Sequence, residues 1–299
     1  MVLSPVQDWF FAHRFSGEHH WNQSVLLDLK PAGNNFMEDF HAGGSLPSLW
    51  RRLKDHLDLN AKTVNGETIG QIIARWPAYV DDKIIRPLDN PLVKNEAIAI
   101  LKGNLAPGGA AIKLAAATPK LFQHEGPAVV FESLEDLEKR IDDPNLNVTP
   151  QSVMVLRNAG PMGAPGMPEA GYIPIPKKLA QKGLKDMIRI SDARMSGTSF
   201  GTCVLHTAPE AAVGGPLALV RDGDLVTLDA YAGILHLDVS EDELSRRREQ
   251  WQPPTSPHIR GWPMLYQRHV TQADLGCDLD FLRGDTPEAR VFVPPVVGR

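Results

Sequence analysis

The chain has 299 residues, of which 42% are hydrophobic and 22% are charged, the composition of a globular protein with one or two domains. Its formal net charge of −5 offers no broad positive surface for nucleic acid or an anionic membrane, and no apolar run is long enough to predict a membrane span. Two cysteines, Cys203 and Cys277, exclude a disulfide framework. With no secretory signal at the start, they favour a reducing, cytoplasmic location.

The first part of the chain is predicted to be helical. In residues 45–59, leucines recur at helical spacing after Ser45, which can serve as the N-cap. Residues 67–76 give a second short helical pattern. The proline-containing stretch 86–92 interrupts this pattern, so we place the main boundary there, between a first domain at 1–90 and a second at 91–299.

The second part alternates short apolar runs with Gly/Pro turns, which predicts strands. The predicted strands are residues 97–101, 127–132, 152–157, 187–190, 202–206, 217–220, 225–229 and 234–239. Capping-box patterns predict helices that begin near Ser133, Thr207 and Ser240. Many short strands with few helices between them predict a mixed α/β protein built on a β-barrel or β-sandwich with flanking helices.

Four loops contain more glycine and polar residues than packing requires. They are residues 32–44, 103–113, 158–169 and 191–202. The glycines of 103–113 let backbone N–H groups approach an anion, although a plain turn is the simpler interpretation. The pattern in 32–44 favours helix capping and surface charge over a site.

The loop 158–169 contains three glycines and three prolines and ends at Glu169. A carboxylate on a rigid loop suits a hard cation such as magnesium, while an exposed acid on a connecting segment is the alternative. The loop 191–202 offers Ser196, Gly197 and Thr198, whose N–H and hydroxyl groups can bind a carboxylate. Ser196 can also transfer a proton, but a serine hydroxyl needs a base, a cation or a metal nearby.

The same loops, in the same order, resemble the C-terminal half of the iron–sulfur dehydratase family, which includes dihydroxy-acid dehydratase, 6-phosphogluconate dehydratase and the pentonate dehydratases. The matching stretches are DLKPAGNNFMEDFHAGG (28–44), IIRPLDNPL (84–92), AILKGNLAPGGAAIK (99–113), GPAVVFES (126–133), VLRNAGPMGAPGMPE (155–169), RISDARMSGTSFGT (189–202) and HTAPEAAVGGPLALVRDGD (206–224). The form RNAGPMGAPGMPE with RMSGTSFGT is closer to the sugar-acid branch than to the branched-chain amino-acid enzyme.

The resemblance implies a swivelling β-barrel domain with flanking helices, preceded by a helical remnant of an α/β domain. It implies a lyase that converts a 2,3-dihydroxy acid to a 2-keto-3-deoxy acid. Ser196 would take the C2 proton, Glu169 would bind magnesium, and Gly197 and Thr198 would hold the carboxylate of the small hydroxy-acid substrate. The family's iron–sulfur cluster would assist departure of the 3-hydroxyl.

The cysteines that bind this cluster in the family lie in an N-terminal half that the sequence does not contain, and residues 1–27 do not resemble the segment expected there. We therefore expect a truncated dehydratase that needs a complementing N-terminal half. An apolar face on residues 28–85 would also favour a homo-oligomer. The alternatives are a non-catalytic protein that binds a small acid or a partner, and a cluster-free isomerase or epimerase that uses magnesium and Ser196.

Overall fold

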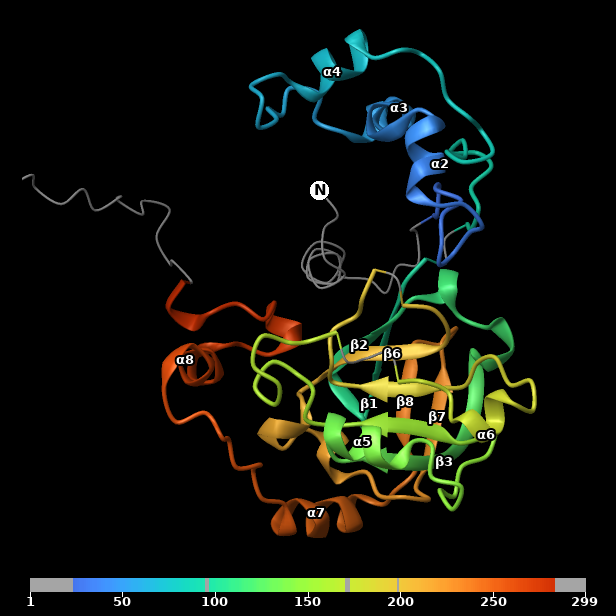
Figure 1. The fold of residues 1–299 in the computed structure, drawn as a ribbon. Coiled ribbons are helices and arrows are strands. Elements are labelled where there is room, and N and C mark those ends of the chain that lie inside the picture. Colours follow the sequence, from blue (N-terminus) through green and yellow to red (C-terminus); the bar gives the residue numbers. More distant parts are fainter. Residues whose placement is uncertain (1–23, 95–96, 170–172, 198, 283–299) are drawn as a thin grey trace, which may run out of the picture.

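A computed structural model describes residues 24–94, 97–169, 173–197 and 199–282. Its first three helices are α2 (Met37–Ala42), α3 (Ser45–Arg52) and α4 (Ile69–Arg75), and they lie together beside a β-barrel (Figure 1). The two predicted helices are thus confirmed, although the first ends earlier and passes into the 3-10 turn Lys54–His56. The predicted N-cap is wrong, because Ser45 is the first residue of α3 and the N-cap is Gly44, which has no side chain to accept a hydrogen bond. In the part of the chain that the structure describes, no helix has the length and apolar character needed to cross a membrane.

Eight strands close into a barrel, which confirms the predicted mixed α/β class and the β-barrel. They are β1 (Ala99–Gly103), β2 (Ala106–Ile112), β3 (Gln123–Phe131), β4 (Val153–Leu156), β5 (Arg189–Ser191), β6 (Cys203–Ala208), β7 (Leu225–Asp229) and β8 (Ile234–Leu237). Their order around the barrel is β1-β2-β6-β5-β4-β3-β7-β8. The run from β3 through β4 and β5 to β6 is parallel, and one parallel bridge between Lys102 and Ile234 joins β1 to β8.

Helices α5 (Leu134–Arg140), α6 (Lys177–Ala180), α7 (Glu241–Gln250) and α8 (Gly261–His269) flank the barrel (Figure 1). The predicted caps of α5 and α7 are confirmed, because the hydroxyls of Ser133 and Ser240 each accept a backbone N–H three residues on. The helix predicted to begin near Thr207 is wrong. Thr207 belongs to β6, and its hydroxyl instead donates to the Ser191 carbonyl of the neighbouring strand.

Strand β4 divides the core into two layers. Val153 and Val155 face the barrel interior, where they join the apolar side chains of the other strands. Met154 and Leu156 point the other way, into a second cluster that packs against α5 and α6. A strand buried on both faces has no polar alternation, which is why this segment is apolar throughout.

Two further expectations were wrong for local reasons. Residues 217–220 were predicted as a strand, but Pro216–Leu219 form a 3-10 helix that begins at a proline suited to helical φ angles. The predicted loop 103–113 contains β2, with Gly103 at the end of β1. A Cβ on Gly103 would overlap the Leu235 carbonyl oxygen, so close strand contact, rather than loop flexibility, explains this glycine.

Candidate functional site

The candidate site lies where two glycine-rich loops meet on the barrel wall. One loop follows β4 and ends at Glu169; the other joins β5 to β6 and carries Ser196. Arg194 connects them, because its Nη1 lies 2.8 Å from Glu169 Oε1 and its Nε donates to the Met167 carbonyl at 2.6 Å. The structure therefore brings the loops of two predicted site residues together, through an arginine that the prediction did not include.

The first loop begins over a buried acid, Asp192. Its carboxylate accepts backbone N–H groups from Asn158 at 3.2 Å, from Ala159 at 2.9 Å and from Ala211 at 2.9 Å. Burial, and then the neighbouring Glu210, raise the pKa of Asp192 to about 7. This one side chain fixes the ends of β4, β5 and β6 relative to one another.

A second buried acid, Glu210, holds the middle of the same loop. Its carboxylate accepts the N–H of Met162 at 2.9 Å, the N–H of Gly163 at 2.9 Å and the side-chain amide of Gln272 at 2.7 Å. Burial raises the pKa of Glu210 as well. These loop N–H groups therefore bind the protein's own acids, which orients the loop and leaves Glu169, at its far end, half exposed.

The second loop crosses from the carboxyl end of β5 to the amino end of β6, because these strands are parallel. Lys113, directly after β2, donates from Nζ to the Ser196 carbonyl at 3.2 Å and to the Gly197 carbonyl at 2.8 Å. Ser196 is partly exposed and Gly197 is exposed. The third predicted residue, Thr198, lies outside the described residues.

His206, on β6, holds the residue before Ser196. Its Nε2 accepts the Met195 N–H at 2.9 Å, so the hydrogen of the neutral ring is on Nδ1. That Nδ1 is buried and has no hydrogen-bond partner among the described residues. Burial, and then the charge of Arg194, lower the pKa of His206 to about 4. The ring is therefore a neutral support at physiological pH.

A buried ion pair anchors the far end of the loop. Arg189 Nη2 lies 2.6 Å from Asp186 Oδ1, and both side chains are almost fully buried. Asp186 also accepts the backbone N–H of Thr202 at 3.0 Å and its hydroxyl at 2.7 Å. Because the loop is fixed at both ends and near Ser196, its backbone is preorganised for binding.

Magnesium and the iron–sulfur cluster fit these residues unequally. The half-exposed carboxylate of Glu169 is a hard oxygen donor, and magnesium usually takes one or two carboxylates together with water and substrate oxygens. An iron–sulfur cluster is usually held by four cysteine thiolates, whereas the chain has only Cys203, which is buried, and Cys277, so these residues do not by themselves fit a cluster. No group of three His, Cys, Asp or Glu side chains is placed to hold a metal within the described ranges.

The residues that the sequence did not reveal are all charged or polar supports: Lys113, Asp192, Arg194, His206 and Glu210. Arg194 and Asp192 lie within the predicted loop 191–202, but nothing in the pattern shows which group each contacts. Lys113 directly follows the apolar end of β2, which the glycine-rich pattern predicts as part of the loop 103–113. A prediction of this run as a strand would place the lysine at the end of that strand.

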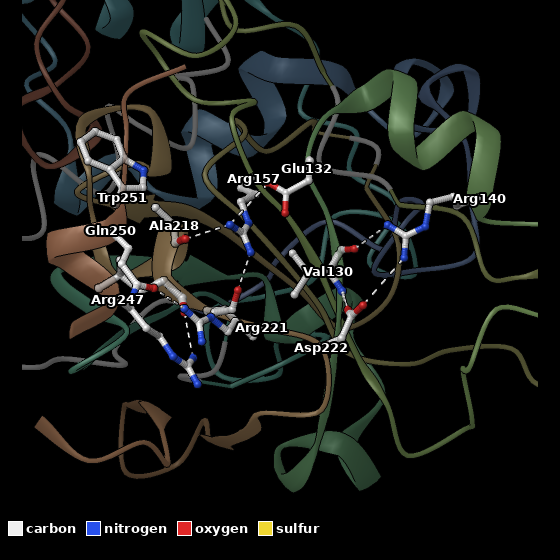
Figure 2. Close-up of a pocket in the computed structure, with 12 residues that line it drawn as sticks. Val130, Glu132, Arg140, Arg157, Ala218, Arg221, Asp222, Arg247, Gln250 and Trp251 are labelled. Carbon is white, nitrogen blue, oxygen red and sulfur yellow. Dashed lines mark hydrogen bonds and ion pairs between the residues drawn. The ribbon is translucent and has the colours of Figure 1, made fainter. Parts of the chain in front are cut away.

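A cavity of about 450 Å³ lies nearby, lined by side chains of β3, of the residues that follow β3 and β4, of the 3-10 helix Pro216–Leu219 with the turn 220–222, and of α7 (Figure 2). Its arginines are already engaged. Arg247 pairs with Asp224 and Glu243, and Arg157 donates to the Ala218 and Val220 carbonyls. The cavity is therefore a paired polar network and not a free cationic pocket.

Comparisons with known proteins find relatives whose matched segment includes both loops. The model of the dihydroxy-acid/6-phosphogluconate dehydratase C-terminal domain matches residues 83–277. The chain is 54% identical over 262 residues to a 6-deoxy-6-sulfo-D-gluconate dehydratase of Pseudomonas putida, covering 87% of this chain and 45% of that protein. It is 51% identical over 292 residues to an L-arabonate dehydratase of Azospirillum brasilense, covering 95% and 49%.

A dihydroxy-acid dehydratase of Synechococcus sp. (strain JA-3-3Ab) is 42% identical over 262 residues, covering 86% of this chain and 45% of that protein. The chain thus spans about half the length of the curated relatives it matches.

Proposed function

The chain belongs to the dihydroxy-acid/6-phosphogluconate dehydratase family, and we propose that it forms the part of a sugar-acid dehydratase that holds the substrate carboxylate and removes the C2 proton. The substrate class is a 2,3-dihydroxy acid, which becomes a 2-keto-3-deoxy acid. Identities of 54% and 51% to two sugar-acid dehydratases, against 42% to a dihydroxy-acid dehydratase, favour a sugar acid.

The observation that carries this proposal is the junction of the Glu169 loop with the Ser196 loop through Arg194. In the proposed reaction, Ser196 Oγ takes the proton from C2, and the electron pair of that bond forms a C2–C3 double bond as the 3-hydroxyl leaves. The hydroxyl takes a proton from an acid and departs as water. The enol then gains a proton at C3 and loses the proton of its C2 hydroxyl, and the products are the keto acid and one water.

The other proposed roles follow from position. Gly197 and Thr198 follow Ser196 directly and would bind the substrate carboxylate through N–H and hydroxyl groups. Glu169 would be a ligand of magnesium, which, when bound, supplies positive charge that stabilises an enolate. Arg194 pairs with one carboxylate oxygen of Glu169, so magnesium would bind the other oxygen or displace Arg194.

The departure of the 3-hydroxyl needs an acid that we do not assign to this chain. The chain's two cysteines are too few to hold an iron–sulfur cluster by themselves. We assign this part of the reaction to the half of the relatives' length that the chain does not span. A complementing N-terminal half, or a homo-oligomer that shares the site, is the partner that this proposal requires.

The test is a dehydration assay with the purified chain, alone and together with the N-terminal half of the L-arabonate dehydratase, after supply of iron, sulfide and magnesium. We expect 2-keto acid from L-arabonate in the combined sample. Ser196→Ala should lower the rate by about 10²-fold or more, the usual contribution of a general base. Ser199→Ala in the same loop is the matched control. Turnover that survives Ser196→Ala would overturn the proposal.

A second candidate function is binding of a small acid without turnover. The presence of only two cysteines, Cys203 and Cys277, favours it, because they cannot supply the four ligands that an iron–sulfur cluster usually takes. Calorimetric binding of L-arabonate, with neither keto acid nor loss of C2 deuterium in any combination, would support this function. Loss of C2 deuterium without keto acid would instead indicate an isomerase or epimerase.

A further inference from the structure

Lys113 reaches the Ser196 backbone from a different strand. It directly follows β2, 83 positions before Ser196, and is partly buried. Its Nζ lies 2.8 Å from the Gly197 carbonyl oxygen and 3.2 Å from the Ser196 carbonyl oxygen. Both acceptors are neutral, so these bonds leave the positive charge of the ammonium uncancelled.

We propose that Lys113 positions Ser196 and activates it, because its ammonium holds the backbone at Ser196 and Gly197 and stabilises the serine alkoxide. This inference rests on the proposed function, in which Ser196 Oγ takes the C2 proton. In the activation step the hydroxyl proton of Ser196 passes to water and Lys113 keeps its protons. The alkoxide then takes the C2 proton, which restores the hydroxyl.

The distance permits this role. The carbonyl oxygen and the Oγ of one serine are a few ångströms apart, so Nζ lies within roughly 7 Å of the Ser196 hydroxyl. A serine hydroxyl is inert at its free pKa and becomes a base only when a nearby group favours its charged form. A cation at this separation in a partly buried site changes the alkoxide population by roughly tenfold or more.

The residues around Lys113 do not neutralise its positive charge. The Lys113 side chain is partly buried, so water has only partial access to it, and this burial lowers its pKa. On β6, Cys203 is a neutral thiol at physiological pH, with its pKa raised to about 11, and His206 is a neutral ring, with its pKa lowered to about 4. Lys185, in the segment before β5, is a basic residue. Arg189 and Asp186 are paired with each other. None of these groups is an unpaired acid that would neutralise Lys113.

The backbone around Ser196 is held from a second side. His206 accepts the N–H of Met195, the residue before Ser196, while Lys113 binds the carbonyls of Ser196 and Gly197. The two supports come from β6 and from the end of β2, which are neighbours in the barrel. The Ser196 carbonyl also accepts the Ser199 N–H at 3.2 Å. Loss of Lys113 would therefore remove one of several supports and leave the fold of the barrel in place.

The experiment measures labelling of Ser196 by an alkyl fluorophosphonate, with the modified peptide identified by mass spectrometry, between pH 6 and pH 10. Lys113→Gln removes the charge, Lys113→Arg keeps it, and Lys113→Met keeps the packing of the stem should the glutamine variant fail to fold. Lys178 is the matched control, since its Nζ also donates to two backbone carbonyls, those of Pro144 and Leu146, away from Ser196.

We expect Lys113→Gln and Lys113→Met to lower the labelling rate roughly tenfold and to move the pH profile upward. Lys113→Arg should retain most of the rate, and Lys178→Gln should not change it. A purely structural role would lower the rate in the arginine variant equally and leave the pH profile in place. Wild-type labelling and pH profile in Lys113→Gln and Lys113→Met, or no labelling of Ser196 in the parent protein, would overturn the inference.

The dehydration assay separates this inference from the proposed function. If Ser196→Ala dehydrates the acid at the parent rate, the proposed function fails whatever the labelling shows. If Ser196→Ala is inactive while Lys113→Gln labels like the parent, Ser196 remains the base and only the role of Lys113 is wrong.

Discussion

Arg194 Nη1 lies 2.8 Å from Glu169 Oε1, so the arginine two positions before Ser196 is paired with the carboxylate that we assign to magnesium. The same guanidinium donates from Nε to the Met167 carbonyl, within the loop that carries Glu169. A cation that binds Glu169 must therefore compete with Arg194, and a movement of either loop is transmitted to the other.

Arg194→Gln should strengthen magnesium binding at Glu169 several-fold, because a competing positive charge is removed. Both side chains are well exposed, at 40% and 49%, so the free energy of unfolding should change by less than about 1 kcal/mol. Titration calorimetry with magnesium chloride and urea unfolding measure the two effects. Glu169→Gln, which should abolish this binding, is the control. Weaker binding in the arginine variant would show that Arg194 supports the cation.

The sequence located the two loops of this site but not the contacts within them. Glycine and proline cluster in 158–169, and glycine with small polar residues in 191–202, each after an apolar run, and both loops do follow strands. The contacts of Asp192 and Glu210 with the first loop are long-range, with 33 and 48 positions between partners. No local pattern specifies such pairs, because they depend on how the parallel strands β4, β5 and β6 are ordered.

The fold was predictable where local chemistry and tertiary structure agree. Ser133 and Ser240 cap helices as their patterns predict, and β7 and β8 occupy segments of alternating apolar residues. The glycine-rich β2 was missed because its small residues permit strand contact, while the same composition also occurs in loops. Propensity alone cannot separate these two causes.

Asp192→Asn should change how stability depends on pH. The pKa of Asp192 rises from 3.8 to about 7 in the folded state, so the native protein binds more protons than the unfolded chain between about pH 4 and pH 7. This contribution is fully present at low pH and is lost as the pH rises through 7. The variant lacks it and should be destabilised by about 2 kcal/mol at pH 5 and by less at pH 8.

Urea unfolding at pH 5 and pH 8 measures this difference. Asp238→Asn, which makes the same substitution at an exposed position, is the control. Because Asp192 and Glu210 interact, the measured midpoint belongs to the pair. An equal loss of stability at both pH values would show that Asp192 is ionised throughout.

His206→Gln should change the pH dependence of the free energy of unfolding in the opposite sense to Asp192→Asn. Its pKa falls from 6.5 to about 4 on folding, so the unfolded chain binds more protons between about pH 4 and pH 6.5, and the native protein loses stability as the pH falls through this range. Glutamine can still accept the Met195 N–H but does not titrate. Unfolding at pH 7 and pH 4.5 should show a cost at pH 7 that shrinks or reverses at pH 4.5. His236→Gln, exposed on β8, is the control, and parallel curves for His206→Gln and the parent would contradict the shift.

Gly201→Ala should be the most damaging single change in the Ser196 loop. Gly201 has a φ of +93°, and an added Cβ would overlap the Arg189 guanidinium and approach the Asp186 carboxylate. Because separating a buried ion pair leaves uncompensated charge, we expect a loss of at least about 3 kcal/mol.

Gly183→Ala is the matched control, since Gly183 has a φ of +89° and nothing lies within 4 Å of its added Cβ. Backbone strain alone should cost about 1 kcal/mol there. Equal losses in urea unfolding would mean that the added Cβ does not disturb the Asp186–Arg189 pair.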